Sequence, residues 1–184
     1  MKKSLLVIAP AFFICLAAAA SSRSPSQVQS GNVTIREAEA FAYVCLEEKG
    51  PFDKLEGTIG RLVQEMQGQN LVPAGPLLGV YYNSPEEVSA QNLRWEVGFP
   101  VTAQALVQPP LSKKEWSYTQ FAVCLHVGAY EEVGETIRKM LDWMEGNGYR
   151  PAGPVMERYM DMNPEELRPE QLRTEVWIPC QKRT

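Results

Sequence analysis

The sequence is poor in the residues that build metal centres. It contains one histidine, His126, and four cysteines among its 184 residues. No pair of cysteines shows the CxxC spacing of a zinc site, and no cysteine stands at metal-ligand spacing from the histidine. The single histidine also has no marked nucleophile, so no serine–histidine–acid arrangement is readable. We therefore expect no metal and no cofactor.

Basic charge is scarce as well. The chain has 18 lysines and arginines against 22 aspartates and glutamates, which gives a formal net charge of −4. Binding to nucleic acid usually requires a clustered basic patch, and none is visible in the sequence. We therefore expect no nucleic-acid partner.

A long apolar run is present only near the N-terminus. Lys2 and Lys3 precede an apolar stretch over 5–16, and small residues follow at 18–20. This stretch is short for a membrane span but typical of a secretory signal. We expect residues 1–20 to be removed during export to the periplasm or the exterior. Cys15 leaves open a lipid-anchored form, which would be the only contact with a membrane.

Export would allow disulfide formation in the remaining chain. Cys45 and Cys124 stand in similar contexts, Y-V-C-L and A-V-C-L, and could form a disulfide. A cysteine within an apolar strand can equally be a small buried hydrophobic residue. The sequence leaves both alternatives open, and Cys180 has no evident partner.

The chain repeats itself. The tetrapeptide Pro-Ala-Gly-Pro occurs at 73–76 and again at 151–154, a separation of 78 residues. Two stripes of apolar residues at helical spacing repeat with the same separation. The first stripe is Phe52, Leu55, Ile59, Leu62, Val63 and Met66, and the second is Tyr130, Val133, Ile137, Met140, Leu141 and Met144. We infer a tandem duplication.

Each copy has the order strand, helix, strand, strand. Strands are predicted at about 40–47, 77–82 and 93–101 in the first copy, and at 116–125, 155–160 and 172–180 in the second. Module 1 then spans about 33–101 and module 2 about 116–180, within a domain at 33–184. Residues 21–32 are rich in serine and glutamine and predict a flexible tether. Residues 102–115, with two prolines and a charged run, predict a linker.

The predicted fold class is α+β. A duplicated β-α-β-β module would form two antiparallel sheets and a central groove, with one main helix per module. One helix cannot cover both faces of a three-stranded sheet, so we expect the helices on one face and a shared groove on the other. A groove between modules is a common ligand site. Because the two modules of one chain already form a pair related by a pseudo-twofold axis, we expect a monomer.

Each copy contains a pair of related segments. They are G-V-Y-Y-N-S-P-E-E-V and L-R-W-E-V-G-F-P in the first copy, and E-R-Y-M-D-M-N-P-E-E-L and L-R-T-E-V-W-I-P in the second. These segments, in this order, resemble the GyrI-like small-molecule-binding domain, which shares its general architecture with the SOUL haem-binding proteins. The helix of the second copy also matches the family, through Gly128, Tyr130, residues 134–136, Trp143 and Gly148. The resemblance covers roughly 40–180.

The resemblance implies a hydrophobic, aromatic-lined cleft with a buried acid that meets cationic, lipophilic ligands. It assigns the acid to Glu157 and a cleft-lining aromatic ring to Trp177. The same domain forms the effector-binding half of AraC-type and MerR-type multidrug regulators. Their DNA-binding half is absent here, so transcriptional control is not implied.

The residues themselves show where the two copies differ. Glu157 corresponds to Gly79, and Trp177 corresponds to Gly98. Strand alternation puts Glu157 and Tyr159 on one face of their strand, and Gly79 and Tyr81 on the matching face of the other copy. The predicted ligand-binding residues are Glu157, Tyr159, Trp177, Tyr81, Tyr43 and Gly79.

The sequence thus predicts binding of a hydrophobic or amphipathic small molecule, which can be a cation. An alternative is hydrolysis of reactive small molecules, as in some GyrI-like proteins, with Glu157 and Tyr159 as acid–base groups. Haem binding through His126 is a further alternative, although a lone turn histidine is expected at the surface. The fourth is an envelope interaction protein whose groove is filled by its own side chains. Glu96 and Glu175, equivalent in both copies, indicate a structural role.

Overall fold

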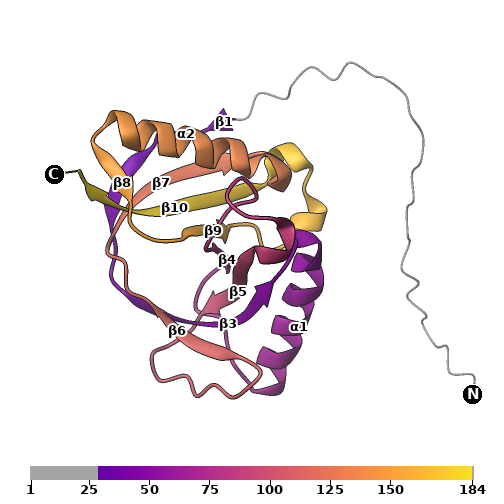
Figure 1. Cartoon of the computed structure of the whole chain (residues 1–184). Helices are drawn as coiled ribbons and strands as arrows, with labels where there is room; N and C mark the ends of the chain where they lie inside the picture. The colour runs from indigo at the N-terminus through magenta and orange to yellow at the C-terminus, as the bar shows by residue number, and fades with distance from the viewer. Residues whose placement is uncertain (1–28, 184) are drawn as a thin grey trace, which may run out of the picture.

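We describe a computed structural model of the chain, which places residues 29–183 (Figure 1). The predicted signal segment 1–20, the Cys15 lipidation site and residues 21–28 of the predicted tether lie outside the described residues. Within them, no helix has the length and apolar character needed to cross a membrane.

Two main helices and ten strands make up the described chain. Module 1 contains β3 (Phe41–Lys49), α1 (Leu55–Gly68), β4 (Leu77–Tyr81) and β5 (Arg94–Pro100). Module 2 contains β7 (Gln120–Val127), α2 (Val133–Gly146), β9 (Val155–Tyr159) and β10 (Arg173–Lys182). Short strands accompany them: β1 (Gln29–Ser30), β2 (Thr34–Glu37), β6 (Ser112–Trp116) and β8 (Tyr149–Pro151). The predicted order β-α-β-β, twice, and the α+β class are confirmed.

The strands form one antiparallel sheet, where two sheets were expected. Its order is β1-β7-β10-β9-β4-β5-β3-β6, with β2 on β7 and β8 on β10. The modules join where β4 pairs with β9, and the register sets Gly79 opposite Glu157. The pairs Leu77–Tyr159 and Tyr81–Val155 lie symmetrically about that position. The pseudo-twofold axis therefore passes through the Gly79–Glu157 pair.

Both helices cover the same face of the sheet. The buried side of α1 carries Leu62 and Met66, which pack against Trp95 and Val97 of β5. The buried side of α2 carries Met140 and Met144, which pack against Val176 and Ile178 of β10 and Ala122 and Cys124 of β7. Figure 1 shows α2 near β7 and β10 and α1 near β3 and β5, with β9 and β4 between them.

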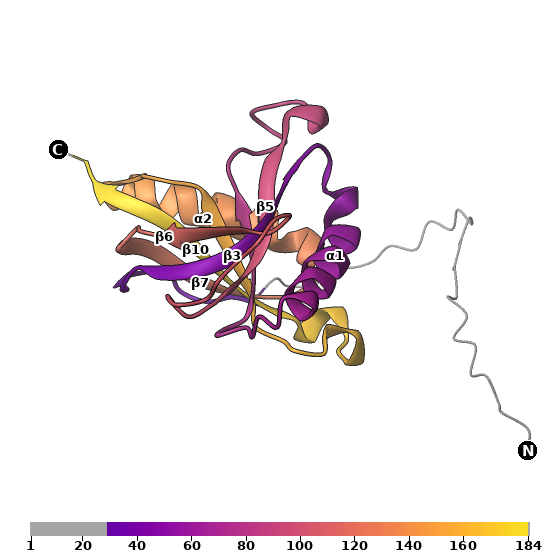
Figure 2. The same cartoon turned by 90° about the horizontal axis from the view of Figure 1, so that it is seen from below.

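The opposite face of the sheet is filled by its own side chains, which corrects the expectation of a groove there. Phe121, Met156 and Leu78 are completely buried in this core, and Trp116 and Tyr43 nearly so. The rings of Trp116 on β6 and Phe121 on β7 lie 6.3 Å apart, although β6 is the last strand of the order and β7 the second. The twisted sheet, seen from below in Figure 2, therefore curls around this core.

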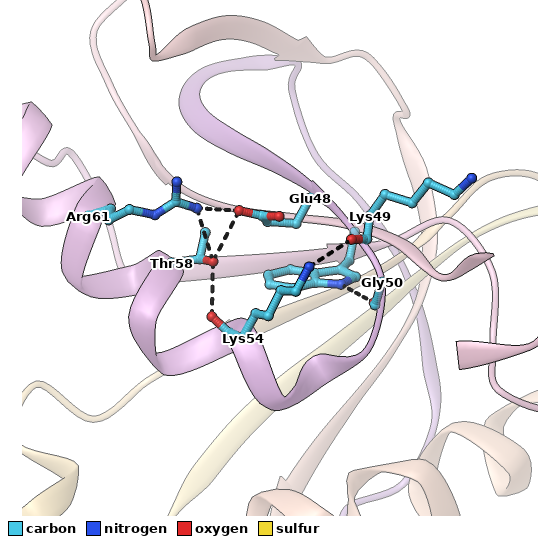
Figure 3. Close-up of polar contacts among 7 residues, drawn as sticks. Glu48, Lys49, Gly50, Lys54, Thr58 and Arg61 are labelled. Carbon is cyan, nitrogen blue, oxygen red and sulfur yellow. Dashed lines mark hydrogen bonds and ion pairs between the residues drawn. The ribbon is translucent and has the colours of Figure 1, made fainter. Parts of the chain in front are cut away.

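Polar contacts fix the start of α1 to the sheet (Figure 3). Arg61 forms an ion pair with Glu48 on β3, and the Thr58 hydroxyl lies 3.4 Å from the same carboxylate. The indole N–H of Trp95 donates to the carbonyl oxygen of Gly50 at 2.9 Å. These contacts hold the turn between β3 and α1, which carries Phe52.

Three of the predicted boundaries are wrong. Residues 112–115 of the predicted linker form β6 together with Trp116, and this strand pairs with β3. The strand predicted at 116–125 is therefore divided between β6 and β7. Gln29 and Ser30, assigned to the flexible tether, pair with the end of β7. The polar composition of 29–30 and 112–115 concealed edge strands, whose pairing is made by backbone hydrogen bonds.

Cys45 and Cys124 are free and buried, and they lie on opposite faces of the sheet. The pairings Cys45–Gly98 and Val123–Trp177 make Val123 the structural equivalent of Cys45. The sequence match between the two cysteines was therefore off by one residue. A shift of one residue moves a strand side chain to the other face, which rules out the disulfide.

His126 is fully buried, so its predicted place at the surface is wrong. Alternation along β7 directs it to the helix-covered face, where its Nδ1 lies 2.8 Å from the Thr136 hydroxyl. Its Nε2 lies 3.1 Å from the carbonyl oxygen of Ala129, which can only accept, so Nε2 carries a hydrogen. With both nitrogens bonded, the ring offers no position for haem iron.

Candidate functional site

A carboxylate and two tyrosine hydroxyls meet at the pseudo-twofold axis. Tyr159 donates its hydroxyl hydrogen to Oε2 of Glu157 at 2.8 Å. The hydroxyl oxygens of Tyr81 and Tyr159 are also 2.8 Å apart. Because Tyr159 gives its hydrogen to the carboxylate, Tyr81 is the donor in this second bond. The proton chain therefore runs from Tyr81 through Tyr159 to Glu157, and all three side chains are half-buried.

Strand register explains how these groups come together. Directly opposed residues of an antiparallel pair point to the same face, as do residues two apart on one strand. Glu157 and Tyr159 on β9 therefore share a face with Gly79 and Tyr81 on β4. Glu157 also lies opposite Val176, which packs under α2. The group consequently lies on the helix-covered face, between the two helices.

Gly79 makes room for one of the rings. A Cβ atom at this position would lie 2.8 to 3.0 Å from the outer atoms of the Tyr81 ring. Any side chain at 79 would therefore displace the ring. A carboxylate at position 79 would lie directly opposite Glu157. Two neighbouring carboxyls disfavour each other's ionised form, because their charges repel. Because position 79 is glycine, the site contains a single acid, Glu157, and at most one negative charge from it.

Two further rings repeat the internal symmetry. The ring of Phe52, just before α1, meets Tyr81 edge-on with centroids 5.4 Å apart and an interplanar angle of 87°. The ring of Tyr130, just before α2, meets Tyr159 with the same centroid distance and the same angle. Both rings belong to the helical stripes of the sequence, but their place beside the carboxylate was not predicted. The sequence contains one indication of it: Phe52 and Tyr130 are 78 residues apart, as are Tyr81 and Tyr159.

Glu157 has no cationic partner in the described chain. Across residues 29–183, every ion pair involves other acids. Burial of the carboxyl raises its pKa to about 7, and the hydrogen bonds from Tyr159 and Tyr81 oppose that rise. Burial likewise raises the pKa of Tyr81 and Tyr159 above the ordinary tyrosine value. Glu157 is thus a carboxyl that changes charge near neutral pH.

Two predicted site residues lie elsewhere. Trp177 is opposite Met156, so it points away from the face of Glu157. Its ring packs on Phe121 at 4.8 Å and lies under the guanidinium of Arg158 at 4.6 Å. Tyr43 is 3% exposed on that same opposite face. The structure therefore brings together Glu157, Tyr159, Tyr81 and Gly79, and separates Tyr43 and Trp177 from them.

The equivalent acids Glu96 and Glu175 have structural partners. Glu96 is fully buried, accepts a hydrogen bond from Tyr43 and forms an ion pair with Lys114. Glu175 forms an ion pair with Arg158 at 2.6 Å. Both acids join neighbouring strands on the face opposite Glu157, which fits the predicted structural role.

The described residues place no metal-ligand cluster at the Glu157 group. Among the described residues, no cluster of three or more histidines, cysteines or acids could hold a metal ion. A surface hollow of about 400 Å³ lies elsewhere, lined by Glu37, Ala38, Glu39 and Thr119. That hollow contains none of the predicted site residues. An aromatic-lined cleft at Glu157 therefore stays a prediction from the resemblance.

A family model for the GyrI-like small molecule binding domain matches residues 31–181, nearly the whole described chain. The chain belongs to the GyrI-like family. The duplicated order of elements agrees with membership in the GyrI-like family. No curated protein matches the chain.

Solved structures show the same GyrI-like fold at low sequence identity. EcmrR in a complex with DNA is 17% identical, with a TM-score of 0.73 over 82% of this chain and 57% of that chain. The present chain thus spans just over half of EcmrR. A hydrolase from Listeria innocua is 13% identical, with a TM-score of 0.63 over 81% and 91% of the two chains. SAV2435 bound to tetraphenylphosphonium is 14% identical, with a TM-score of 0.57 over 82% and 94%.

Proposed function

We propose that this GyrI-like protein binds a lipophilic small molecule that carries a positive charge. Glu157 supplies the counter-charge, and Tyr81, Tyr159, Phe52 and Tyr130 supply aromatic contacts. The observation that carries the proposal is a half-buried carboxylate that has hydroxyl partners but, among residues 29–183, no cationic partner. A cationic guest would stabilise the ionised carboxylate, and ring faces attract cations by roughly 0.5–2 kcal/mol each.

The solved complex of SAV2435 with tetraphenylphosphonium supports this choice, because that protein shares the fold and binds a lipophilic cation. The sharpest test is calorimetric titration of the protein with tetraphenylphosphonium and with triphenylphosphine oxide, a neutral molecule with similar rings. We expect binding of the cation above about pH 7, weaker binding below it as Glu157 gains its proton, and little binding of the neutral compound.

The variant Glu157→Gln should bind the cation about tenfold to a hundredfold more weakly, the range for loss of one charge-assisted contact. Glu145→Gln is the matched control, since it removes one negative charge from an exposed position on α2. Equal weakening in both variants would show that net charge governs binding, and would contradict a specific role of Glu157.

A second candidate is hydrolysis of a strained electrophile at the same group. A carboxyl with a pKa of about 7 is partly ionised at neutral pH and could take a proton from an attacking water. Once the carboxyl holds that proton, the Tyr159 hydroxyl 2.8 Å away can give its own hydrogen to the leaving oxygen and regain one from Glu157, which restores the group. The test is product formation from an epoxide such as styrene oxide. Turnover that persists in Glu157→Gln would exclude this mechanism.

We also propose that binding takes place outside the cytoplasm. The basis is the sequence pattern of residues 1–20, which is typical of a secretory signal. Cell fractionation, with mass measurement of the exported protein, tests the proposal. A mass corresponding to cleavage near Ala20 would support it, a lipid-modified Cys15 would indicate anchoring, and a full-length cytoplasmic protein would contradict it.

A further inference from the structure

A second group of charged side chains lies on the face of the sheet opposite Glu157. Lys49 at the end of β3 pairs directly with Arg94 at the start of β5, so both side chains point to the same face. Tyr82 and Asn83 follow β4 and adjoin Arg94, whose carbonyl oxygen accepts a hydrogen bond from the Tyr82 N–H at 3.0 Å. We call these four residues the Arg94 corner.

The duplication supplies an internal comparison for this corner. In module 2 the equivalent arginine is Arg173, which lies opposite Val127. Asp161 binds the Arg173 guanidinium at 2.7 and 3.0 Å and also accepts the Arg173 backbone N–H at 2.6 Å. The arginine of module 2 is therefore neutralised by its own chain and has an apolar neighbour.

In module 1 the acid is replaced by an amide. Asn83 takes the place of Asp161 and keeps the backbone contact, because its Oδ1 accepts the Arg94 N–H at 2.9 Å. Its amide nitrogen donates to the carbonyl oxygen of Asn92 at 3.3 Å. Nothing replaces the two contacts that Asp161 makes with a guanidinium. Arg94 instead lies over the Tyr82 ring, 5.3 Å from its centroid.

The corner consequently carries two uncompensated positive charges. Among residues 29–183, neither Lys49 nor Arg94 forms an ion pair. The nearby Lys114 is different, since it pairs with both Glu47 and Glu96. Figure 3 shows the Lys49 side chain running away from the other residues drawn. Like charges directly opposite each other in a sheet are unfavourable unless a counter-charge is present.

We propose that Lys49 and Arg94 together bind a phosphate group. Two free cations match the charge of a phosphate monoester, and the guanidinium fork suits its oxygens. The half-exposed Tyr82 ring holds the guanidinium in place from one side. The same chemistry is offered by a soluble phosphate ester and by a phospholipid headgroup, and the experiment separates these sources. This site is independent of the ligand proposed for Glu157, because it lies on the other face of the sheet.

The first experiment is an NMR titration of the protein with inorganic phosphate at low salt. We expect saturable shifts of the backbone signals of Lys49, Tyr82 and Arg94, and weakening with added sodium chloride. Asn83→Asp is the decisive variant. It recreates in module 1 the acid of module 2, keeps both cations, and should weaken phosphate binding at least tenfold. Arg94→Gln should have a similar effect.

Asp161→Asn is the matched variant in module 2. It frees Arg173 but leaves Val127 as its neighbour, so it should not create a second site of comparable affinity. Thermal unfolding of each variant verifies that it is folded. Shifts that do not saturate, or that Asn83→Asp leaves unchanged in a folded protein, would overturn the proposal.

Vesicle sedimentation then distinguishes the two sources of phosphate. The protein from about Ser21 onward is mixed with vesicles of phosphatidylcholine alone, and with vesicles that also contain phosphatidic acid. Sedimentation with the second kind only, lost in Asn83→Asp, supports a lipid headgroup. Binding of inorganic phosphate without sedimentation supports a soluble phosphate ester. Sedimentation that Asn83→Asp does not alter would count against the Arg94 corner.

Discussion

The ionisation of Glu157 should make the free energy of unfolding depend measurably on pH. Its pKa is raised to about 7 in the folded protein, from 4.5 for an unperturbed carboxyl. The folded state therefore holds the proton more tightly, and the stability that this contributes is complete below pH 4.5 and lost as the pH rises through 7. Glu157→Gln should be more stable than the original chain at pH 8, by roughly 1–3 kcal/mol once partial exposure is allowed for, and equal to it at pH 4.

Urea unfolding of both proteins at these two pH values provides the measurement. A difference that is the same at both values would mean that the substitution acts through packing, and that Glu157 does not change its charge in this range.

The two tyrosines should affect the Glu157 carboxyl unequally. Tyr159 donates to the carboxylate directly, and Tyr81 acts mainly through Tyr159. Both hydrogen bonds lower the Glu157 pKa, that of Tyr159 more strongly. Tyr159→Phe should therefore raise this pKa further than Tyr81→Phe does. Carbon NMR titration of the labelled carboxyl measures both. The reverse order would contradict the proton chain described for the site.

At the scale of elements, each helix packs against the sheet through one narrow row of buried side chains. Met140 on α2 is fully buried, whereas its neighbour Leu141 is 37% exposed. Met140→Ala should cost about 2–5 kcal/mol of unfolding free energy through the lost contacts and the cavity left behind. Leu141→Ala should cost less than about 1 kcal/mol. Chemical denaturation compares the two, and similar losses would indicate that α2 is packed differently.

The strands show where local patterns are informative and where they are not. Alternation and the repeat of 78 residues were enough to make Gly79 the counterpart of Glu157 and to place each on one face of its strand with a tyrosine. The direct pairing of the two strands, with these residues opposite each other, came only from the structure. The edge strand β6 was missed, since its sequence S-K-K-E-W has the polar composition of a linker. Its pairing with β3 depends on backbone groups, which every sequence possesses.

At the scale of the whole molecule, the modules should unfold together. The β4–β9 pairing joins them, and the core opposite the helices contains Tyr43 and Leu78 from module 1 with Phe121 and Met156 from module 2. We expect one cooperative transition. In a urea titration followed by NMR, the indole signals of Trp95 in module 1 and Trp143 in module 2 should disappear at the same midpoint. Separate midpoints would show that each module folds by itself.

The sequence alone determined the duplication, the class of the fold and the group of Glu157, Tyr159, Tyr81 and Gly79 on one face. These features depend on spacing and alternation, which are local properties of the chain. Only the tertiary structure decided which face of the sheet the helices cover. It buried Trp116, Phe121 and Tyr43 on the other face, removed Trp177 from the site, and placed Phe52 and Tyr130 beside it. The curl of the sheet results from the twist of all its strands together, so the sequence pattern of a single strand does not predict it.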